Sequence, residues 1–267
     1  MKLFLLAFDG LDPYLVEEWS PLLPHLRQRK WSAYQSSEEI LTPYLWASII
    51  TGLPPKEALP AVHSVVPVNP IFRWAKKNLR FLRGLGLGKF VKRRWVNKSD
   101  LASPAIFDVV ERSIVIDFPA YNWHMDFEIC VKYPYSKVIG DKEKSEILFT
   151  TVQSHDREKI QMAERILMND HSWDIFAIWI YSTDMVNHLY WRDRLKILKT
   201  YKMADSFAER IQKLLPDDCA MVIMSDHGGW RGVHRDKGFV SVNKDMELPS
   251  KTVDFYNFFL KILNEPG

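Results

Sequence analysis

The chain carries four short apolar runs: Leu3–Phe8, Ser113–Phe118, Asp174–Tyr181 and Ala220–Met224. Runs of this length, bounded by turns or helices, are typical of strands that are covered on both faces. Apolar residues also recur at helical spacing in three longer segments: Asp156–Met168, Arg194–Leu215 and Thr252–Leu263. Strands that alternate with helices predict an α/β fold, a doubly wound α/β/α sandwich with a mostly parallel central sheet.

Charged and imidazole side chains follow three of these runs. In sheets of this kind, ligands bind beyond the carboxyl ends of the strands. The residues found there are Asp9, Asp184, His188, Asp226, His227 and, a little further on, His234. Singly, each fits a turn, a cap or a structural histidine, but together they predict one shared site. Carboxylate oxygens with imidazole nitrogens suit Zn²⁺ or Mn²⁺, and the lack of thiolates disfavours a structural zinc site.

The spacing of these residues supports the same hypothesis. Asp184 and His188 stand four residues apart, so on a helix they share one face and can reach the same ion. Glycines at 228, 229 and 232 allow the backbone to bend tightly, which would return His234 to the site.

Thr42 is the candidate nucleophile. Followed by Pro43, it reads as the N-cap of a short helix, with the proline at the first helical position. A helix N-terminus offers free N–H groups and positive potential to a phosphoryl group. A threonine hydroxyl attacks only once its proton is lost, which metal coordination achieves. The plainer alternative is that Thr42 is only a good cap.

Length and composition predict one globular domain over residues 1–267. Apolar content of 47% and charged content of 26% are ordinary for a soluble protein. The first apolar run is too short for a secretory signal and no run approaches a membrane span, so we expect a cytoplasmic protein. Cys130 and Cys219 lie far apart without a CxxC spacing, which fits a reducing compartment.

A basic inserted segment at about 70–98 is the second unusual feature. It holds ten Lys or Arg and no acidic residue, which leaves 26 basic against 33 acidic residues elsewhere. Its apolar residues fall at helical spacing, so it could be a surface helix, a lid that attracts an anionic substrate, or a helix (71–98) on an anionic membrane surface. No RNA-binding signature accompanies it, and a nucleic-acid partner is not expected.

Several motifs in order resemble the alkaline phosphatase superfamily, in particular the type I phosphodiesterase/nucleotide pyrophosphatase family with its short archaeal members. The motifs are "FDG", "LTPYLWASIITGLPP", "SPAIFDVVERSIVIDFPAYNW", "YSTDMVNHLYW" and "SDHGG" with "GVHRDKGFV". They extend from residue 3 to residue 240. The resemblance implies an alkaline-phosphatase-like α/β/α sandwich.

The resemblance also implies a centre of two divalent metal ions, Zn²⁺ or alternatively Mn²⁺. One ion would be held by Asp184, His188 and His234, and the other by Asp9, Thr42, Asp226 and His227. Thr42 would attack phosphorus and form a phospho-threonine intermediate. By position, His63 stands where nucleotide pyrophosphatases have a phosphate-contacting Asn, so it is a candidate substrate-binding residue.

The function expected from these observations is a metal-dependent phosphodiesterase acting on a phosphoester small molecule. A phosphomonoesterase or phosphotransferase using the same centre is the first alternative. A non-catalytic protein that binds polyanions or a membrane surface is the second. The chain departs from many relatives at Ala58 and Leu59, where they carry His-Gly, so nucleotide specificity is not carried over.

Overall fold

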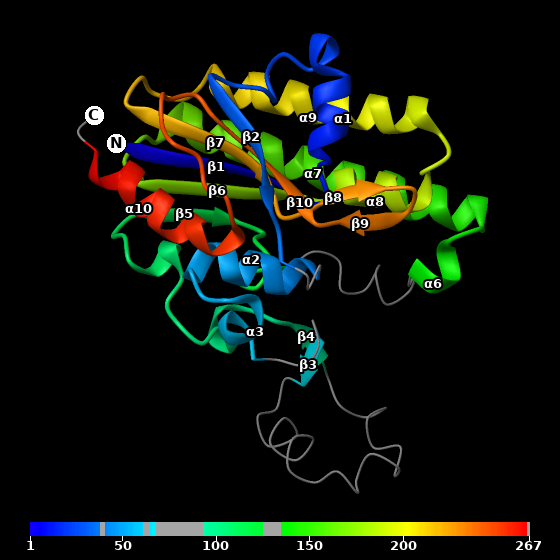
Figure 1. The fold of residues 1–267 in the computed structure, drawn as a ribbon, viewed down its shortest axis with the longest axis horizontal. Helices are drawn as coiled ribbons and strands as arrows, with labels where there is room; N and C mark the ends of the chain where they lie inside the picture. Colours follow the sequence, from blue (N-terminus) through cyan, green and yellow to red (C-terminus); the bar gives the residue numbers. More distant parts are fainter. Residues whose placement is uncertain (38–40, 61–64, 68–92, 125–134, 266–267) are drawn as a thin grey trace, which may run out of the picture.

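The structure is a computed structural model, and it describes residues 1–37, 41–60, 65–67, 93–124 and 135–265. A six-stranded central sheet organises the molecule (Figure 1). In spatial order its strands are β2 (Lys30–Gln35), β10 (Lys237–Val242), β7 (Cys219–Ser225), β1 (Lys2–Phe8), β6 (Ile175–Ile180) and β5 (Ser113–Ile116).

The four predicted apolar runs form the parallel part of this sheet. β1 pairs in parallel with both β7 and β6, placing Leu5 between Val222 and Ala177, and β6 pairs in parallel with β5. β10 runs antiparallel to both β7 and β2. The predicted mostly parallel sheet is therefore confirmed, with an antiparallel extension at one edge that the apolar runs did not indicate.

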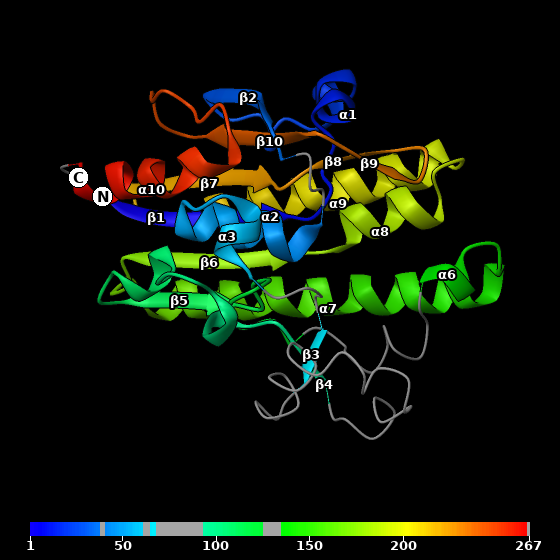
Figure 2. The same cartoon turned by 60° about the horizontal axis from the view of Figure 1, so that its bottom comes forward.

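Helices pack on both faces of the sheet (Figure 2). Along β1, Phe4 and Leu6 belong to the core shared with α1, α7, α8 and α9, whereas Leu5 and Ala7 belong to the core shared with α2 and α10. This alternation is the period of two that a strand covered on both sides requires. The helices are α1 (Pro13–Glu18), α2 (Thr42–Thr51), α3 (Pro55–Ala58), α6 (Tyr135–Val138), α7 (Lys142–Asn169), α8 (Ser182–Leu189), α9 (Arg194–Gln212) and α10 (Phe255–Asn264).

Some predicted boundaries were wrong. The helix expected over Asp156–Met168 is the second half of the 28-residue α7, which starts earlier because the Asp141 side chain caps it at the backbone N–H of Lys144. The strand expected to reach Phe118 ends at Ile116, since Asp117 turns the chain with a positive φ of 50°. α9 ends at Gln212, three residues short of the predicted end.

Two small hairpins complete the described structure. β3 (Val65–Pro67) pairs with β4 (Arg93–Trp95), and β8 (Gly228–Trp230) pairs with β9 (Val233–Arg235). Most of the basic segment, residues 68–92, lies outside the described residues. None of the helices in the described part of the chain has both the length and the apolar character needed to cross a bilayer.

Candidate metal centre

The carboxyl end of β1 delivers Asp9 to the edge of the sheet where β6 and β7 also end. Asp9 is fully buried, and its Oδ1 accepts a hydrogen bond from Thr42 Oγ1 at 3.2 Å. Gly10 follows with a φ of 63°, and a Cβ there would stand only 2.8 Å from Cβ of Asp184. Glycine is therefore required at position 10 for Asp9 and Asp184 to come together.

α8 carries the second pair of predicted residues directly after β6. Asp184 and His188 lie one helical turn apart, and Asp184 Oδ1 is 3.2 Å from His188 Nε2. The start of α8 is fixed by Asp156 of α7, whose carboxylate accepts hydrogen bonds from the backbone N–H groups of Tyr181 and Ser182. The predicted shared helix face is what the structure shows.

The third pair, Asp226 and His227, follows β7, and both side chains are fully buried. His227 Nε2 is 3.2 Å from Asp9 Oδ1 and 3.6 Å from Asp226 Oδ2. Asp226 Oδ1 accepts a hydrogen bond from the backbone N–H of Gly10 at 3.4 Å. The side chains that follow β7 therefore contact the residues that follow β1 directly.

The β8–β9 hairpin returns His234 to the same place. Its two-residue turn has positive φ at Arg231 (52°) and Gly232 (80°), the combination that defines a type I′ hairpin. His234 Nε2 lies 2.8 Å from His188 Nε2 and 3.6 Å from Asp184 Oδ1, and its ring stacks on that of His227. The return of His234 predicted from the glycines is confirmed.

Backbone carbonyls fix which ring nitrogens face inward. His188 Nδ1 is 3.0 Å from the carbonyl oxygen of Gly232, and His227 Nδ1 is 3.0 Å from that of Gly228. Because a carbonyl only accepts, each Nδ1 carries a hydrogen, so Nε2 of either ring can bind a metal ion through its lone pair once the ring is neutral. This arrangement is the one that metal-ligating histidines adopt.

Several buried polar atoms of this cluster have no hydrogen-bond partner. They are Asp9 Oδ2, Asp184 Oδ1, Asp226 Oδ2 and His227 Nε2. A buried polar atom without a partner costs about 1–3 kcal/mol, and more when it is charged. These atoms belong to residues at one edge of the sheet, and two groups of the side chains found there could hold a cation.

The electrostatics of the cluster lead to the same conclusion. Burial raises the pKa of Asp9 to about 6, and repulsion from Asp184 adds to the shift. Burial, followed by repulsion from Asp9, raises the pKa of Asp226 well above its usual range. Burial alone would lower the pKa of His227, but Asp226 and Asp9 outweigh it and raise that pKa to about 10. Asp9, Asp226 and His227 therefore all bind their protons more tightly than usual, which offsets the negative charge of the buried carboxylates.

Asp184 shifts the other way because it lies among imidazoles. Burial would raise its pKa, but His188, with smaller contributions from His227 and His234, outweighs burial and brings the pKa to about 2. Two groups of potential ligand atoms, each within 4.8 Å of one another, share this residue: Asp184, His188 and His234, and Asp9, Asp184 and His227. Asp184 belongs to both groups, although the resemblance implies it as a ligand of one ion only, and Asp226 belongs to neither.

The helix position of Thr42 differs from the prediction. Leu41 is the N-cap of α2, Thr42 is the first helical residue and Pro43 is the second. The Thr42 hydroxyl donates to Asp9 instead of capping the helix. The N-cap interpretation was wrong, and with it the plainer alternative that Thr42 only caps α2. His63 lies outside the described residues.

Sequence reasoning missed the residues that hold α8 in place. Asp156 and Lys159 are buried in α7, and Lys159 Nζ contacts Asp156 Oδ1 at 3.0 Å and Asp117 Oδ2 at 3.3 Å. The available signal was a carboxylate and an amine at i and i+3 inside the apolar stripe of a predicted helix.

Comparisons with known proteins point to one family. The family model of type I phosphodiesterase/nucleotide pyrophosphatase matches residues 3–248. No curated protein matches the chain in sequence. Among solved structures, the PH0037 protein from Pyrococcus horikoshii is similar at 11% identity and a TM-score of 0.51, covering 98% of this chain and 96% of that one.

Two larger proteins are also similar to the chain in structure. Murine ectonucleotide pyrophosphatase/phosphodiesterase 5 has 12% identity and a TM-score of 0.50, covering 85% of this chain and 57% of that one. A phosphonoacetate hydrolase from Sinorhizobium meliloti 1021, in complex with phosphonoacetate, has 16% identity and a TM-score of 0.49, covering 85% and 56%. The chain spans just over half the length of each. The predicted alkaline-phosphatase-like fold is confirmed.

Proposed function

Because the chain belongs to the type I phosphodiesterase/nucleotide pyrophosphatase family of the alkaline phosphatase superfamily, we propose that it is a metal-dependent phosphodiesterase with Thr42 as its nucleophile. The observation that carries the proposal is the convergence of three buried carboxylates and three imidazoles beside the Thr42 hydroxyl, with four buried ligand atoms left without partners. A cluster with no cation to hold would keep these groups together at a large cost in desolvation.

The donor atoms support two divalent ions. In this proposal Asp184, His188 and His234 hold one ion, and Asp9, Thr42, Asp226 and His227 hold the other. Nitrogen and carboxylate donors favour Zn²⁺, with Mn²⁺ as the alternative. When bound, such a pair clamps the phosphoryl group and offsets the charge that develops on the attacking and leaving oxygens.

Thr42 supplies the attacking oxygen. Its Oγ1 bonds to phosphorus, the bond from phosphorus to the leaving alkoxide breaks, and the proton of the hydroxyl leaves toward Asp9 Oδ1, which already accepts it at 3.2 Å. Water then cleaves the phospho-threonine and restores the hydroxyl. Thr42 stands at the N-terminus of α2, where the positive end of the helix dipole favours the charge of a phosphoryl group.

The test is turnover by Thr42→Ala and Thr42→Ser variants on bis-p-nitrophenyl phosphate. We expect Thr42→Ala to lose at least about a thousandfold in kcat while its metal content stays within about twofold, and Thr42→Ser to retain measurable turnover. Full activity in Thr42→Ala would exclude the covalent route. Faster turnover of p-nitrophenyl phosphate than of the diester would favour a phosphomonoesterase on the same centre.

A further inference from the structure

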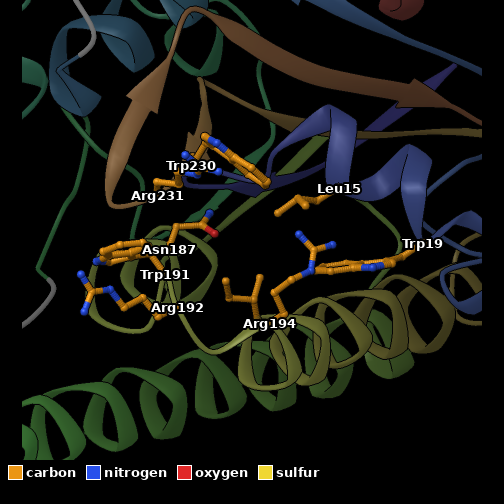
Figure 3. Close-up of a pocket in the computed structure, with 10 residues that line it drawn as sticks. Leu15, Trp19, Asn187, Trp191, Arg192, Arg194, Trp230 and Arg231 are labelled. Atoms are coloured by element: carbon orange, nitrogen blue, oxygen red, sulfur yellow. The ribbon is translucent and has the colours of Figure 1, made fainter.

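A pocket of about 270 Å³ lies between α1, the α8–α9 connection and the β8–β9 hairpin, and the function proposed above does not use it (Figure 3). Its wall includes Leu15 and Trp19 from the α1 region and Ile197 from α9, all members of the core on the α1, α7 and α9 side of the sheet. α2, which carries Thr42, packs into the core on the opposite side. The pocket is therefore not the place where a substrate would meet Thr42.

Tryptophan and arginine alternate around the opening of the pocket. The Arg192 guanidinium lies 4.4 Å from the centre of the Trp191 ring, and the Arg231 guanidinium lies 5.5 Å from that of Trp230, which Arg235 also contacts at 4.8 Å. A guanidinium stacked on an aromatic ring keeps its in-plane N–H fork available for a carboxylate or a phosphate. The opening is thus built from flat apolar surfaces that each hold a planar donor group.

The arginine charges are only partly neutralised by the protein. Arg194 stacks over Trp19 and pairs with Glu18. Arg192 and Arg231, by contrast, form no ion pair within the described residues, and no carboxylate is among the residues that line the pocket. Two exposed cations that share one opening attract an anion.

The interior of the pocket is apolar except for Asn187. Leu15 and Ile197 line it, and the Asn187 amide is held by donation from Nδ2 to the carbonyl oxygen of Gly10 at 3.0 Å. A neutral amide offers no charge to balance an anion. A ligand would therefore place its charged end at the arginines and its flat, apolar body inside.

The hairpin turn offers a second, independent indication. Arg231 occupies the first central position of a type I′ turn with a φ of 52°. That position favours Asn, Asp or Gly, so the turn gives no reason for an arginine, whereas the pocket does. Gly232, the next residue, accepts the hydrogen bond from His188. A ligand bound to Arg231 would thus also hold the strand pair that orients His188 and carries His234.

We propose that this pocket binds a small organic monoanion or dianion, of the class of an aryl monophosphate, and that its occupancy is coupled to the metal centre through the β8–β9 hairpin. The pocket is small beside the roughly 300–1,000 Å³ of drug-sized sites, which limits the ligand to a single ring with one phosphate. Coupling of two sites is reciprocal, so metal loading should also tighten the pocket.

The test is calorimetric titration of the metal-loaded full chain with phenylphosphonate, which carries a ring and a dianion and has no ester bond to cleave. The decisive variant is Arg192→Gln combined with Arg231→Gln; both side chains are exposed, so the fold should tolerate the change. Arg27→Gln is the matched control, because Arg27 also stacks on an indole (Trp31, 4.1 Å) and forms no ion pair with the residues that the structure describes, but does not line the pocket.

We expect the double variant to bind phenylphosphonate at the pocket at least about tenfold more weakly than the wild type. The Arg27→Gln and Thr42→Ala variants should keep the wild-type affinity at the pocket. Binding at the pocket should weaken with added salt, and inorganic phosphate should bind there less tightly than phenylphosphonate. Identical isotherms for the double variant and Arg27→Gln would overturn the proposal. If the pocket bound inorganic phosphate as tightly as phenylphosphonate, the proposal that the ligand carries an aromatic ring would be wrong.

Discussion

Two clusters of buried ionisable side chains lie at the carboxyl ends of the strands, and they treat charge differently. In the Lys159 cluster, formed by Lys159, Asp156 and Asp117, the amine contacts both carboxylates and donates to the carbonyl oxygen of Trp179 at 2.8 Å. The metal-centre cluster (Asp9, Asp184, Asp226, His188, His227 and His234) contains more carboxylate than fixed cation and has four unpartnered atoms.

The comparison shows that this fold can satisfy buried charge from its own side chains when it needs to. None of the atoms of the Lys159 cluster is among the buried atoms without partners in the described chain. Burial would lower the pKa of Lys159, but Asp156 and Asp117 outweigh burial and raise it. Of the two clusters, the metal-centre cluster is therefore the one with buried atoms that lack partners, and a bound cation would supply those partners.

The largest expected effect comes from Asp184→Asn, because Asp184 belongs to both potential ligand groups. The substitution removes a negative charge from the site, so turnover should fall at least about a thousandfold and metal content should drop. In the absence of metal the variant should be less stable than the wild type at neutral pH, because the lowered pKa of Asp184 means that its charge is stabilised by the neighbouring imidazoles in the folded state. Elemental analysis, diester turnover and urea unfolding measure the three quantities.

Asp205→Asn is the matched control for this substitution. Asp205 is also a buried aspartate on a helix, but it accepts hydrogen bonds from the backbone N–H groups of His25 and Leu26, away from the metal-centre cluster. Its variant should keep both metal and turnover. Equal losses of metal in the two variants would mean that Asp184 acts through folding and not as a ligand.

The next effect is on stability and belongs to the Lys159 cluster. Lys159→Met removes the cation that contacts the buried carboxylate of Asp156 and the partly buried carboxylate of Asp117, and it should cost about 3–5 kcal/mol of unfolding free energy. Turnover per folded molecule should change far less than in Asp184→Asn. Lys144→Met, in the same helix but at an exposed ion pair with Asp141, should unfold like the wild type. A loss of stability much smaller than this in Lys159→Met would contradict the view that Lys159 neutralises the buried carboxylates of its cluster.

Topology and residue type together made the metal-centre cluster predictable. Asp9, Asp184 and Asp226 each follow an apolar run, and parallel strands end at one edge of a sheet, so their meeting follows from the fold class. The central parallel strands were predictable for the same reason. The edge strand β2 was not, since only part of it is buried and its apolar positions are few.

Contacts between distant segments could not be predicted from local pattern. Asp156 lies 25 residues before Tyr181, whose backbone N–H it accepts, and nothing near either residue indicates the pairing. The pocket beside the hairpin joins α1, α8 and α9 in the same way. Thr42 could be singled out from the sequence as a candidate nucleophile, but its hydrogen bond to Asp9, 33 residues earlier, could not be predicted.

Metal addition should stabilise the protein by a smaller amount, and this effect should depend on the metal-centre cluster and not on the Lys159 cluster. An ion that binds only the folded chain stabilises it by about 2.7 kcal/mol at a hundred times its Kd. We expect Zn²⁺ or Mn²⁺ to raise Tm in the wild type and by the same amount in Lys159→Met, but not in Asp184→Asn. Thermal unfolding with a chelator as the blank measures this. A rise of equal size in Asp184→Asn would place the ion elsewhere.

The smallest effect is a pH dependence that the two clusters should not share. The pKa of Asp9 is about 6 in the folded protein against an ordinary value of 3.8, and that of Asp226 is also raised. A carboxyl group that holds its proton more tightly when folded stabilises the fold below its unfolded pKa, and that stability is lost as pH rises through the folded pKa. The metal-free protein should therefore lose unfolding free energy between about pH 4 and pH 6.

Burial also raises the pKa values of Asp12 and Asp205, so these two carboxyl groups contribute to the same decline, whereas Asp184 and Lys159 act outside this pH range. The pKa of Asp184, lowered to about 2, contributes stability that is lost only as pH falls below 3.8. The raised pKa of Lys159 gives stability that is lost only above 10.5, as pH rises through the folded pKa. Metal binding tightens as its ligands deprotonate, so loading should flatten or reverse the decline. Urea unfolding at each pH, with Asp9→Asn combined with Asp226→Asn as the comparison, decides the matter: a decline that survives in this variant cannot come from the metal-centre carboxylates.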